Sequence, residues 1–281
     1  MSPPDSRHDR SFRKAAWLTA LGIAALCGAV FAAIESRAAS SVPLPVTVLR
    51  IAMAPTTLPV STGERDYTNG GFEAVYAQAL AKHLGVEARL VPLPHGAQAE
   101  ALRQGEVDLV LTRPGAAATP QDGLRALDTG YRSGLSVAMR SDTDVRAWKD
   151  LAGLVVCTTA ENLRAHEQAA QVKGRLKVFD APAQALVQVR TGACAAAILD
   201  RSQLEPLLAQ KEWLKFSATL PATRDSPLEA WLDEGRVGLA APIRTAMQAI
   251  GTTGHWAQRR QKWAANVAFE VYFDQTGPDC H

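Results

Sequence analysis

Thr112 ends a compact apolar run, Asp108–Thr112, Arg113 directly follows it, and both side chains could bind a polar ligand. A hydroxyl can donate or accept a hydrogen bond, and a guanidinium binds carboxylates through two parallel bonds. The run is typical of a buried parallel strand. Ligands of open α/β sheets lie beyond the carboxyl ends of such strands. Thr112, Arg113 and Pro114 are therefore candidate residues of a binding cleft.

A helix and a short strand precede this run and would position it. Apolar residues recur at helical spacing from Ala74 to Leu84, and Gly85 is placed to end the helix. Val86–Pro94 alternates in polarity and contains two prolines, which predicts a short strand.

A second unit of the same kind follows Gly153. Its predicted elements are strands at 154–157, 176–179 and 195–199 and helices at 162–172, 183–190 and 203–210. The later predictions are a returning strand at Trp213–Leu220, an apolar strand at Arg236–Ala240, helical residues from Pro242 to Trp263, and a strand or short helix at Val267–Phe273. Strands and helices that alternate twice over predict an α/β protein of two doubly wound lobes, joined by two hinge strands with a ligand cleft between them. Lobe 1 would comprise residues 46–135 and 221–281, and lobe 2 residues 136–220.

Residues 1–38 have the pattern of a secretory signal peptide. Basic residues precede an apolar run, Ala15–Ile34, and the small residues Ser36 and Ala38 lie at the cleavage positions. An uncleaved membrane anchor is the alternative, because ~20 apolar residues span a bilayer. We favour cleavage and a periplasmic location.

The composition of the remaining chain limits the function classes. Without residues 1–38 the acidic and basic residues balance, and no basic run predicts nucleic-acid binding. Export permits disulfides, and Cys157 and Cys194 either form one or remain buried free thiols. The histidines are scattered without zinc-ligand spacing, so no metal and no cofactor is expected. Common phosphate-binding and hydrolase signatures are absent.

Several segments occur in the order of a known family. They are LRIAMAP (49–55), GGFEAVYAQALAKHLGV (70–86), LRQGEVDLVLT (102–112), TGYRSGLSVAMR (129–140), KDLAGLVVC (149–157) and ALVQVRTGACAAAILD (185–200). The ordered set resembles the extracytoplasmic solute-binding proteins of ABC importers, polar amino-acid type, of family 3. The resemblance implies the type 2 periplasmic binding fold, in which two lobes close on a small solute without chemistry. It also implies the membrane subunits of an ABC transporter as partners, and we expect a monomer.

The carboxylate-binding arginine of the family is missing at its usual spacing. In relatives it follows a Thr-Pro segment, which here is Thr119-Pro120, and Arg125 is the nearest arginine after it. Arg113 stands where the family usually keeps a small residue. Arg113 therefore either enters the cleft to bind an anion or pairs with a surface carboxylate such as Asp122.

In the second lobe, the resemblance marks Asp200, Thr158 and Thr159. Asp200 matches a family position whose carboxylate binds a ligand ammonium group, and the alternative is a helix cap. Thr158 and Thr159 match a helix start whose hydroxyls and N–H groups form an anion seat, although the loop is shorter here.

Three functions follow from these residues. The leading one is capture of a small polar solute, an amino acid or a small carboxylate or amine, for an ABC importer. The second is an accessory or sensor protein, with a periplasmic oxidoreductase such as a quinoprotein dehydrogenase as partner. The third is an enzyme similar to cyclohexadienyl dehydratase, for which Glu73 and Glu161 are the only acid candidates. We favour a protein without catalytic residues. The aromatic residues near the C-terminus, among them Trp256, Trp263 and Phe269, are interpreted as a seam that docks the tail onto the body, with a partner surface as the alternative.

Overall fold

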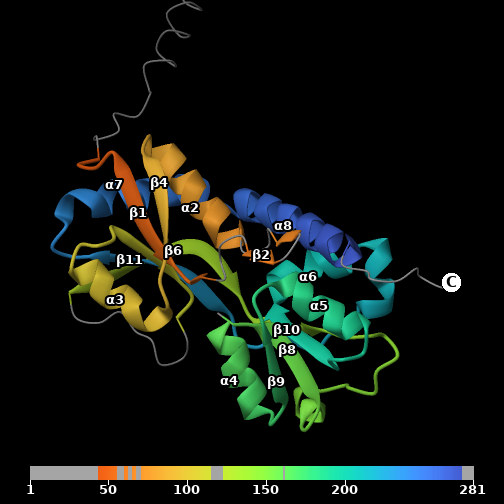
Figure 1. Cartoon of the computed structure of the whole chain (residues 1–281). Coiled ribbons are helices and arrows are strands. Elements are labelled where there is room, and N and C mark those ends of the chain that lie inside the picture. Colours follow the sequence, from red (N-terminus) through yellow and green to blue (C-terminus); the bar gives the residue numbers. More distant parts are fainter. Residues whose placement is uncertain are drawn as a thin grey trace, which may run out of the picture. The chain divides into compact units, whose positions relative to one another are not determined.

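The computed structural model describes residues 44–55, 60–62, 65–67, 71–114, 123–160 and 162–273. These residues form two mixed sheets accompanied by helices (Figure 1), together with a short hairpin of β2 (Val60–Thr62) and β3 (Arg65–Tyr67). The two sheets confirm the predicted α/β fold of two doubly wound units. The predicted signal peptide lies outside the described residues. No helix within the described part of the chain has both the length and the apolar character needed to cross a membrane.

The first sheet combines a parallel half and an antiparallel half. Its strand order is β4 (Glu87–Pro92), β1 (Val48–Met53), β5 (Leu109–Thr112), β11 (Ser226–Asp233) and β6 (Leu124–Ser133). β1 pairs in parallel with β4 and with β5, whereas β11 is antiparallel to both of its neighbours. The crossovers of the parallel half are α2 (Gly71–Leu84) and α3 (His95–Arg103). Gly85 ends α2 as predicted, with a φ of 71° that side chains disfavour.

The second sheet repeats this plan. Its strand order is β7 (Leu135–Ala138), β10 (Ala196–Asp200), β8 (Val155–Thr159) and β9 (Arg175–Phe179). β10, β8 and β9 are parallel, and β7 joins the edge of β10 in the antiparallel direction. The helices of this unit are α4 (Leu163–Gln171), α5 (Pro182–Arg190) and α6 (Arg201–Leu208), and the short 3-10 segments are η2 (Trp148–Leu151) and η3 (Lys211–Phe216).

The chain passes between the two sheets twice, and the two crossings touch. The first crossing is at Gly134 between β6 and β7, and the second lies between η3 and β11. The backbone N–H of Thr223 donates to Leu135 O at 2.9 Å, and the N–H of Leu135 donates to Thr223 Oγ1 at 2.8 Å. A Cβ at position 134 would lie 2.0 Å from the carbonyl oxygen of Thr223. Only glycine therefore permits this close approach.

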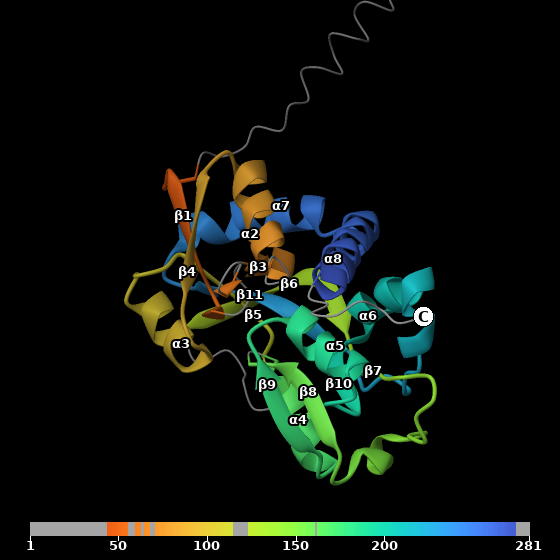
Figure 2. The same cartoon turned by 45° about the vertical axis from the view of Figure 1, so that its right-hand side comes forward.

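The C-terminal helices contribute to a buried apolar cluster that both sheets share. α7 (Val237–Ile250) packs on α2, and α8 (Thr253–Phe273) packs against α5 and α6 while also contacting α2 (Figures 1 and 2). Trp263, Val267 and Val271 of α8 are buried in a cluster that contains residues of both sheets. Trp256 is buried as well, whereas Phe269 is 62% exposed. Helix α8 thus docks on both units, and Val267–Phe273 is helical.

Two strand predictions in this region are wrong. Arg236–Ala240 is not a strand but lies at the start of α7, and its apolar residues belong to a helical face, since Leu239, Ile243 and Met247 are all buried. A short apolar run does not distinguish the two structures. The predicted helix from Pro242 to Trp263 is interrupted at Gly251, where α7 ends.

Trp213–Leu220 is also not a strand. Residues 211–216 form η3, and Ser217 and Ala218 make only isolated bridges to Met139. The actual returning strand is β11, which sequence reasoning missed. This strand begins with Ser-Pro and has no β-branched residue, so its sequence does not favour a strand. It forms because it pairs with β5 on one edge and with β6 on the other.

Asp108 links three segments of the first unit at the entry to β5. Its carboxylate accepts hydrogen bonds from the backbone N–H, Nε and Nη2 of Arg50 on β1, at 2.8 to 3.0 Å. It also pairs with Arg236, directly before α7. The Asp108 side chain is fully buried. Burial alone would raise the pKa of this carboxyl, but the bonds from Arg50 and Arg236 hold the pKa below its usual value.

Cys157 on β8 and Cys194, just before β10, form a disulfide with a Cα–Cα separation of 6.0 Å. Both residues are buried, and β8 and β10 are neighbouring parallel strands. The bond closes a loop that contains α4, β9 and α5.

We expect loss of this disulfide to destabilise the second unit. The bridge joins residues 37 positions apart. Chain-entropy arguments give about 4 kcal/mol for a loop of this size. A Cys157→Ala/Cys194→Ala variant should unfold at a lower urea concentration, with a free energy of unfolding about 4 kcal/mol below that of the wild type. A reductant should change the unfolding curve of the wild type and leave that of the variant unchanged. Equal midpoints for the two proteins would contradict a stabilising bridge.

We expect Asp108→Asn to lower the free energy of unfolding by about 3 kcal/mol at neutral pH, because it leaves two arginines without their buried partner. The native pKa of Asp108 is lowered, so its contribution is complete above the ordinary value of 3.8 and is lost as the pH falls through the native pKa. Urea titrations of both proteins should therefore converge in acid. The control is Asp142→Asn, which breaks an exposed pair with Arg140 and should have little effect.

Candidate functional site

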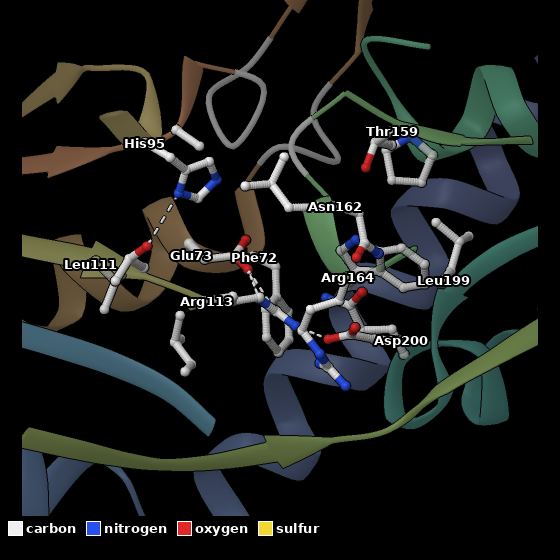
Figure 3. A pocket seen from close by; sticks show the side chains of 17 residues that line it. Phe72, Glu73, His95, Leu111, Arg113, Thr159, Asn162, Arg164, Leu199 and Asp200 are labelled. Carbon is white, nitrogen blue, oxygen red and sulfur yellow. Dashed lines mark hydrogen bonds and ion pairs between the residues drawn. The ribbon is translucent and has the colours of Figure 1, made fainter. Parts of the chain in front are cut away.

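A cavity lies between the two sheets at the carboxyl ends of their strands (Figure 3). The first sheet contributes Thr112 and Arg113 at the end of β5, and the second contributes Thr159 at the end of β8 and Asp200 at the end of β10. Helices α2, α3, α4 and α6 supply further lining residues. The volume is about 80 Å³. This is small beside the several hundred Å³ of drug-sized pockets, because side chains fill much of the space.

Arg113 is the side chain that fills it most directly. Its Nε donates to Glu73 Oε1 at 2.6 Å, and its Nη2 lies 2.5 Å from the same oxygen. Its Nη1 pairs with Asp200 Oδ2 (Figure 3). Glu73 lies in the first turn of α2 and Asp200 ends β10, so a single guanidinium connects the two units. The three side chains are only 20%, 12% and 4% exposed, which makes this a largely buried ion pair.

Two adjacent aromatic rings, 5.0 Å apart, lie beside the guanidinium. Arg113 Cζ lies 4.9 Å from the ring centroid of Tyr131 and 5.7 Å from that of Phe72. The Tyr131 hydroxyl donates to Asp200 Oδ2 at 3.2 Å and is 2.6 Å from Ser202 Oγ. Trp256 packs against both rings at 5.0 and 5.6 Å and donates from Nε1 to Thr129 O. Cation–π contacts add to the ion pairs in this low-dielectric setting.

The charge state of Arg113 follows from the cage of acids and rings around it, which consists of Glu73, Asp200, Phe72 and Tyr131. Burial by itself lowers the pKa of the guanidinium, but the Glu73 carboxylate and Tyr131 raise it, and the net pKa is above the ordinary value. Arg113 is therefore a fixed cation.

Arg164 is a second arginine in the cavity wall, on the first turn of α4. Its Nη1 and Nη2 donate to the backbone oxygens of Ser133 and Arg224 at 3.1 and 3.3 Å. Within the described residues no carboxylate forms an ion pair with it. Burial and then the charge of Arg113 lower the pKa of Arg164. In the described part of the chain, this half-buried cation is compensated by carbonyl dipoles and by the more distant charges of Asp225 and Glu167.

Hydroxyl, imidazole and amide side chains line the rest of the cavity. Thr112 Oγ1 is 3.4 Å from His95 Nδ1. Asn162 caps α4 by accepting from the N–H of Ala165 at 3.1 Å, and Gln203 approaches from α6. The first turn of α4 favours negative charge. In the described part of the chain, no three His, Cys, Asp or Glu side chains are grouped so that they could hold a metal ion.

Most of the predicted site residues meet here. Thr112, Arg113, Thr159 and Asp200 line the cavity. Asp200 occupies the cap position of α6 but its side chain makes no capping bond, so its carboxylate faces Arg113 and Tyr131 instead.

Other predictions fall away from the cavity. Thr158 is fully buried and its hydroxyl donates to Ile198 O at 2.8 Å, which makes it a link between β8 and β10. Arg125 is half exposed and pairs with Glu234. Thr119, Asp122 and Glu161 lie outside the described residues.

Sequence reasoning missed Arg164 and Tyr131, and considered Glu73 only as an acid. The placement of Glu73 and Arg164 at the starts of helices that follow strands was the available signal, because such helix starts lie at the same sheet edge as the strand ends. Tyr131 carried no such signal, since β6 was not predicted.

The fold and the cleft define a two-unit solute-binding protein. The profile of the bacterial extracellular solute-binding proteins, family 3, matches residues 49–266, and the chain belongs to this family. Among curated proteins, none matches the sequence.

Solved structures share the fold at low identity. A mutant of ArgBP from T. maritima is 16% identical, with a TM-score of 0.57, over 78% of this chain and 96% of that one. An ancestral arginine-binding protein bound to arginine is 19% identical, with a TM-score of 0.56, over 78% and 98%. An ancestral amino acid-binding protein described as a precursor of cyclohexadienyl dehydratase is 21% identical, with a TM-score of 0.56, over 77% and 95%.

We expect Asp200→Asn to lower the free energy of unfolding by about 2 kcal/mol, because it removes one of the two acids that compensate a buried guanidinium. Urea unfolding measures the change. The matched control is Asp225→Asn, which removes an exposed carboxylate 3.8 Å from Arg201 and should be near neutral. Equal stability of the Asp200 variant and the wild type would contradict a tight Arg113–Asp200 pair.

Proposed function

We propose that the chain is a periplasmic solute-binding protein that captures a small polar solute in this cavity and presents it to the membrane subunits of an ABC importer. The observation that carries the proposal is a cavity lined by polar side chains from both sheets, in a chain that crosses between them twice. Such a site can form and open by rotation of one unit against the other. The adjoining crossings at Gly134 and Thr223 would be the hinge.

The remaining parts of the proposal concern the maturation and the partners of the protein. We place the units at residues 46–135 with 221–281 and at residues 136–220, and we assign residues 1–38 to a cleaved signal peptide. The family, whose members are extracellular, supports export. The mature protein acts as a monomer, and it binds its solute without catalysing a reaction.

A second function has one supporting observation. The guanidinium of Arg113 fills part of the cleft and engages both acidic side chains, so less of the cleft is available to a solute. A smaller cleft would not impair a protein that serves a periplasmic oxidoreductase as an accessory or sensor and no longer takes part in transport. The dehydratase reading is weaker. Glu73 lines the cavity, but its Oε1 accepts from Arg113, which does not suit a proton donor.

A thermal-shift screen of residues 39–281 against amino acids, small carboxylates, amines and sugars tests solute binding. Binding to the folded state alone at 100 times Kd adds about 2.7 kcal/mol, or about 5 to 10 °C for a chain of this size. We expect one class to produce this shift and Thr159→Val, which changes the cavity wall, to reduce it. The control, Thr191→Val, removes an exposed hydroxyl. A cooperative melt that no compound shifts would contradict the proposal, and co-purification with an oxidoreductase would then support the accessory role.

A further inference from the structure

We infer that Arg113 is a built-in occupant of the cation-binding half of the cleft, and that the solute is a small carboxylate without an ammonium group, bound by Arg164. This inference rests on the proposed solute-binding function and names the class of its ligand.

The first step is the completeness of the cage around Arg113. Acids that pair with the cation and aromatic rings beside it are the features that proteins use to bind a guanidinium or ammonium ligand. Here Glu73 and Asp200 supply the acids and Phe72 and Tyr131 supply the rings, and the cation comes from the chain itself. The site for a positively charged group therefore exists and is already filled.

The second step is the cost of replacing this occupant. A ligand ammonium that reached Asp200 would have to displace the guanidinium from a carboxylate that is 4% exposed. The displaced charge would remain tethered to β5, close to the newcomer and to Arg164. Removing one partner of a buried pair is strongly unfavourable. An ammonium group on the solute is thus a disadvantage.

The third step is what the free part of the cavity offers. Among the described residues, the two carboxylates that line it are bound by Arg113, whereas Arg164 has no acidic partner there. Arg164 belongs to the first turn of α4, and Thr159 lines the same cavity. A guanidinium, a helix start and a hydroxyl together suit a carboxylate. The small volume limits the solute to few atoms.

Matched pairs of ligands test this assignment in the mature protein. Alanine and lactate, valine and 2-hydroxyisovalerate, and glutamate and 2-hydroxyglutarate differ only in an ammonium or a hydroxyl at one carbon. For the pair that binds, titration calorimetry should show the hydroxy acid binding about tenfold or more tightly than the amino acid. Arg113→Ala removes the guanidinium from between Glu73 and Asp200. This variant should therefore bind the amino acid more tightly than the hydroxy acid, by a similar factor. Millimolar guanidinium should also raise the melting temperature of Arg113→Ala but not that of the wild type.

A second variant keeps the test decisive if Arg113→Ala does not fold. Arg164→Gln retains the shape of the half-buried side chain and should weaken hydroxy-acid binding about tenfold or more. The matched control, Arg140→Gln, removes an exposed arginine paired with Asp142 and should bind like the wild type. Unchanged binding by Arg164→Gln would overturn the assignment of Arg164.

The outcomes separate the two proposals. Tighter binding of the amino acid by the wild type would overturn this inference and leave the solute-binding function standing. No binding of either member of any pair, in a protein that no other solute stabilises, would overturn the proposed function and the inference with it.

Discussion

The buried ion pair of Arg113 with Glu73 and Asp200 is the interaction on which the arrangement of the cleft depends. A guanidinium that is only 20% exposed has lost most of its hydration, and the two carboxylates restore the lost stabilisation. Glu73 belongs to the first unit and Asp200 to the second, so the same charges that compensate one another also hold the units together around the cavity. Removing either acid leaves a charge that the interior cannot solvate.

The surrounding structure keeps these charges in place. Trp256 of α8 packs against Phe72 and Tyr131, and these two adjacent rings lie beside the guanidinium. The same helix buries Trp263 and Val267 in a core shared by both sheets. Because protein interiors transmit small displacements through close packing, the position of α8 bears on the geometry of the cleft. If the cleft opens, α8 must either lose part of its packing in this shared core or move together with one of the units. Either change costs free energy.

Much of the fold was predictable because the signals were local. Helices such as α2 and α4 show apolar spacing and recognisable ends, and buried strands such as β5 and β10 are compact apolar runs. The failures came where tertiary pairing outweighs local preference. β11 lacks strand-forming residues yet lies between β5 and β6, and the apolar residues at 236–240 pack as one turn of a helix. Strand position predicted Thr112 and Arg113, and the family resemblance predicted Thr159 and Asp200; all four line the cavity. Thr158, which the resemblance also marked, lies away from the cavity because its hydroxyl bonds to the neighbouring strand.

The order of strands, helices and glycine turns in the sequence by itself determined the class of this protein. It also indicated the sheet edge at which polar residues would gather, because these features depend on local periodicity and on the direction of parallel strands. The tertiary structure alone decided what those residues do together. Arg113, Glu73 and Asp200 are far apart in the chain, and nothing local shows that one guanidinium would pair with both acids. Nor does anything local show that Arg164 would have no acid paired with it among the described residues. Charge compensation in a buried site is a property of distances between side chains, and only the folded chain sets them.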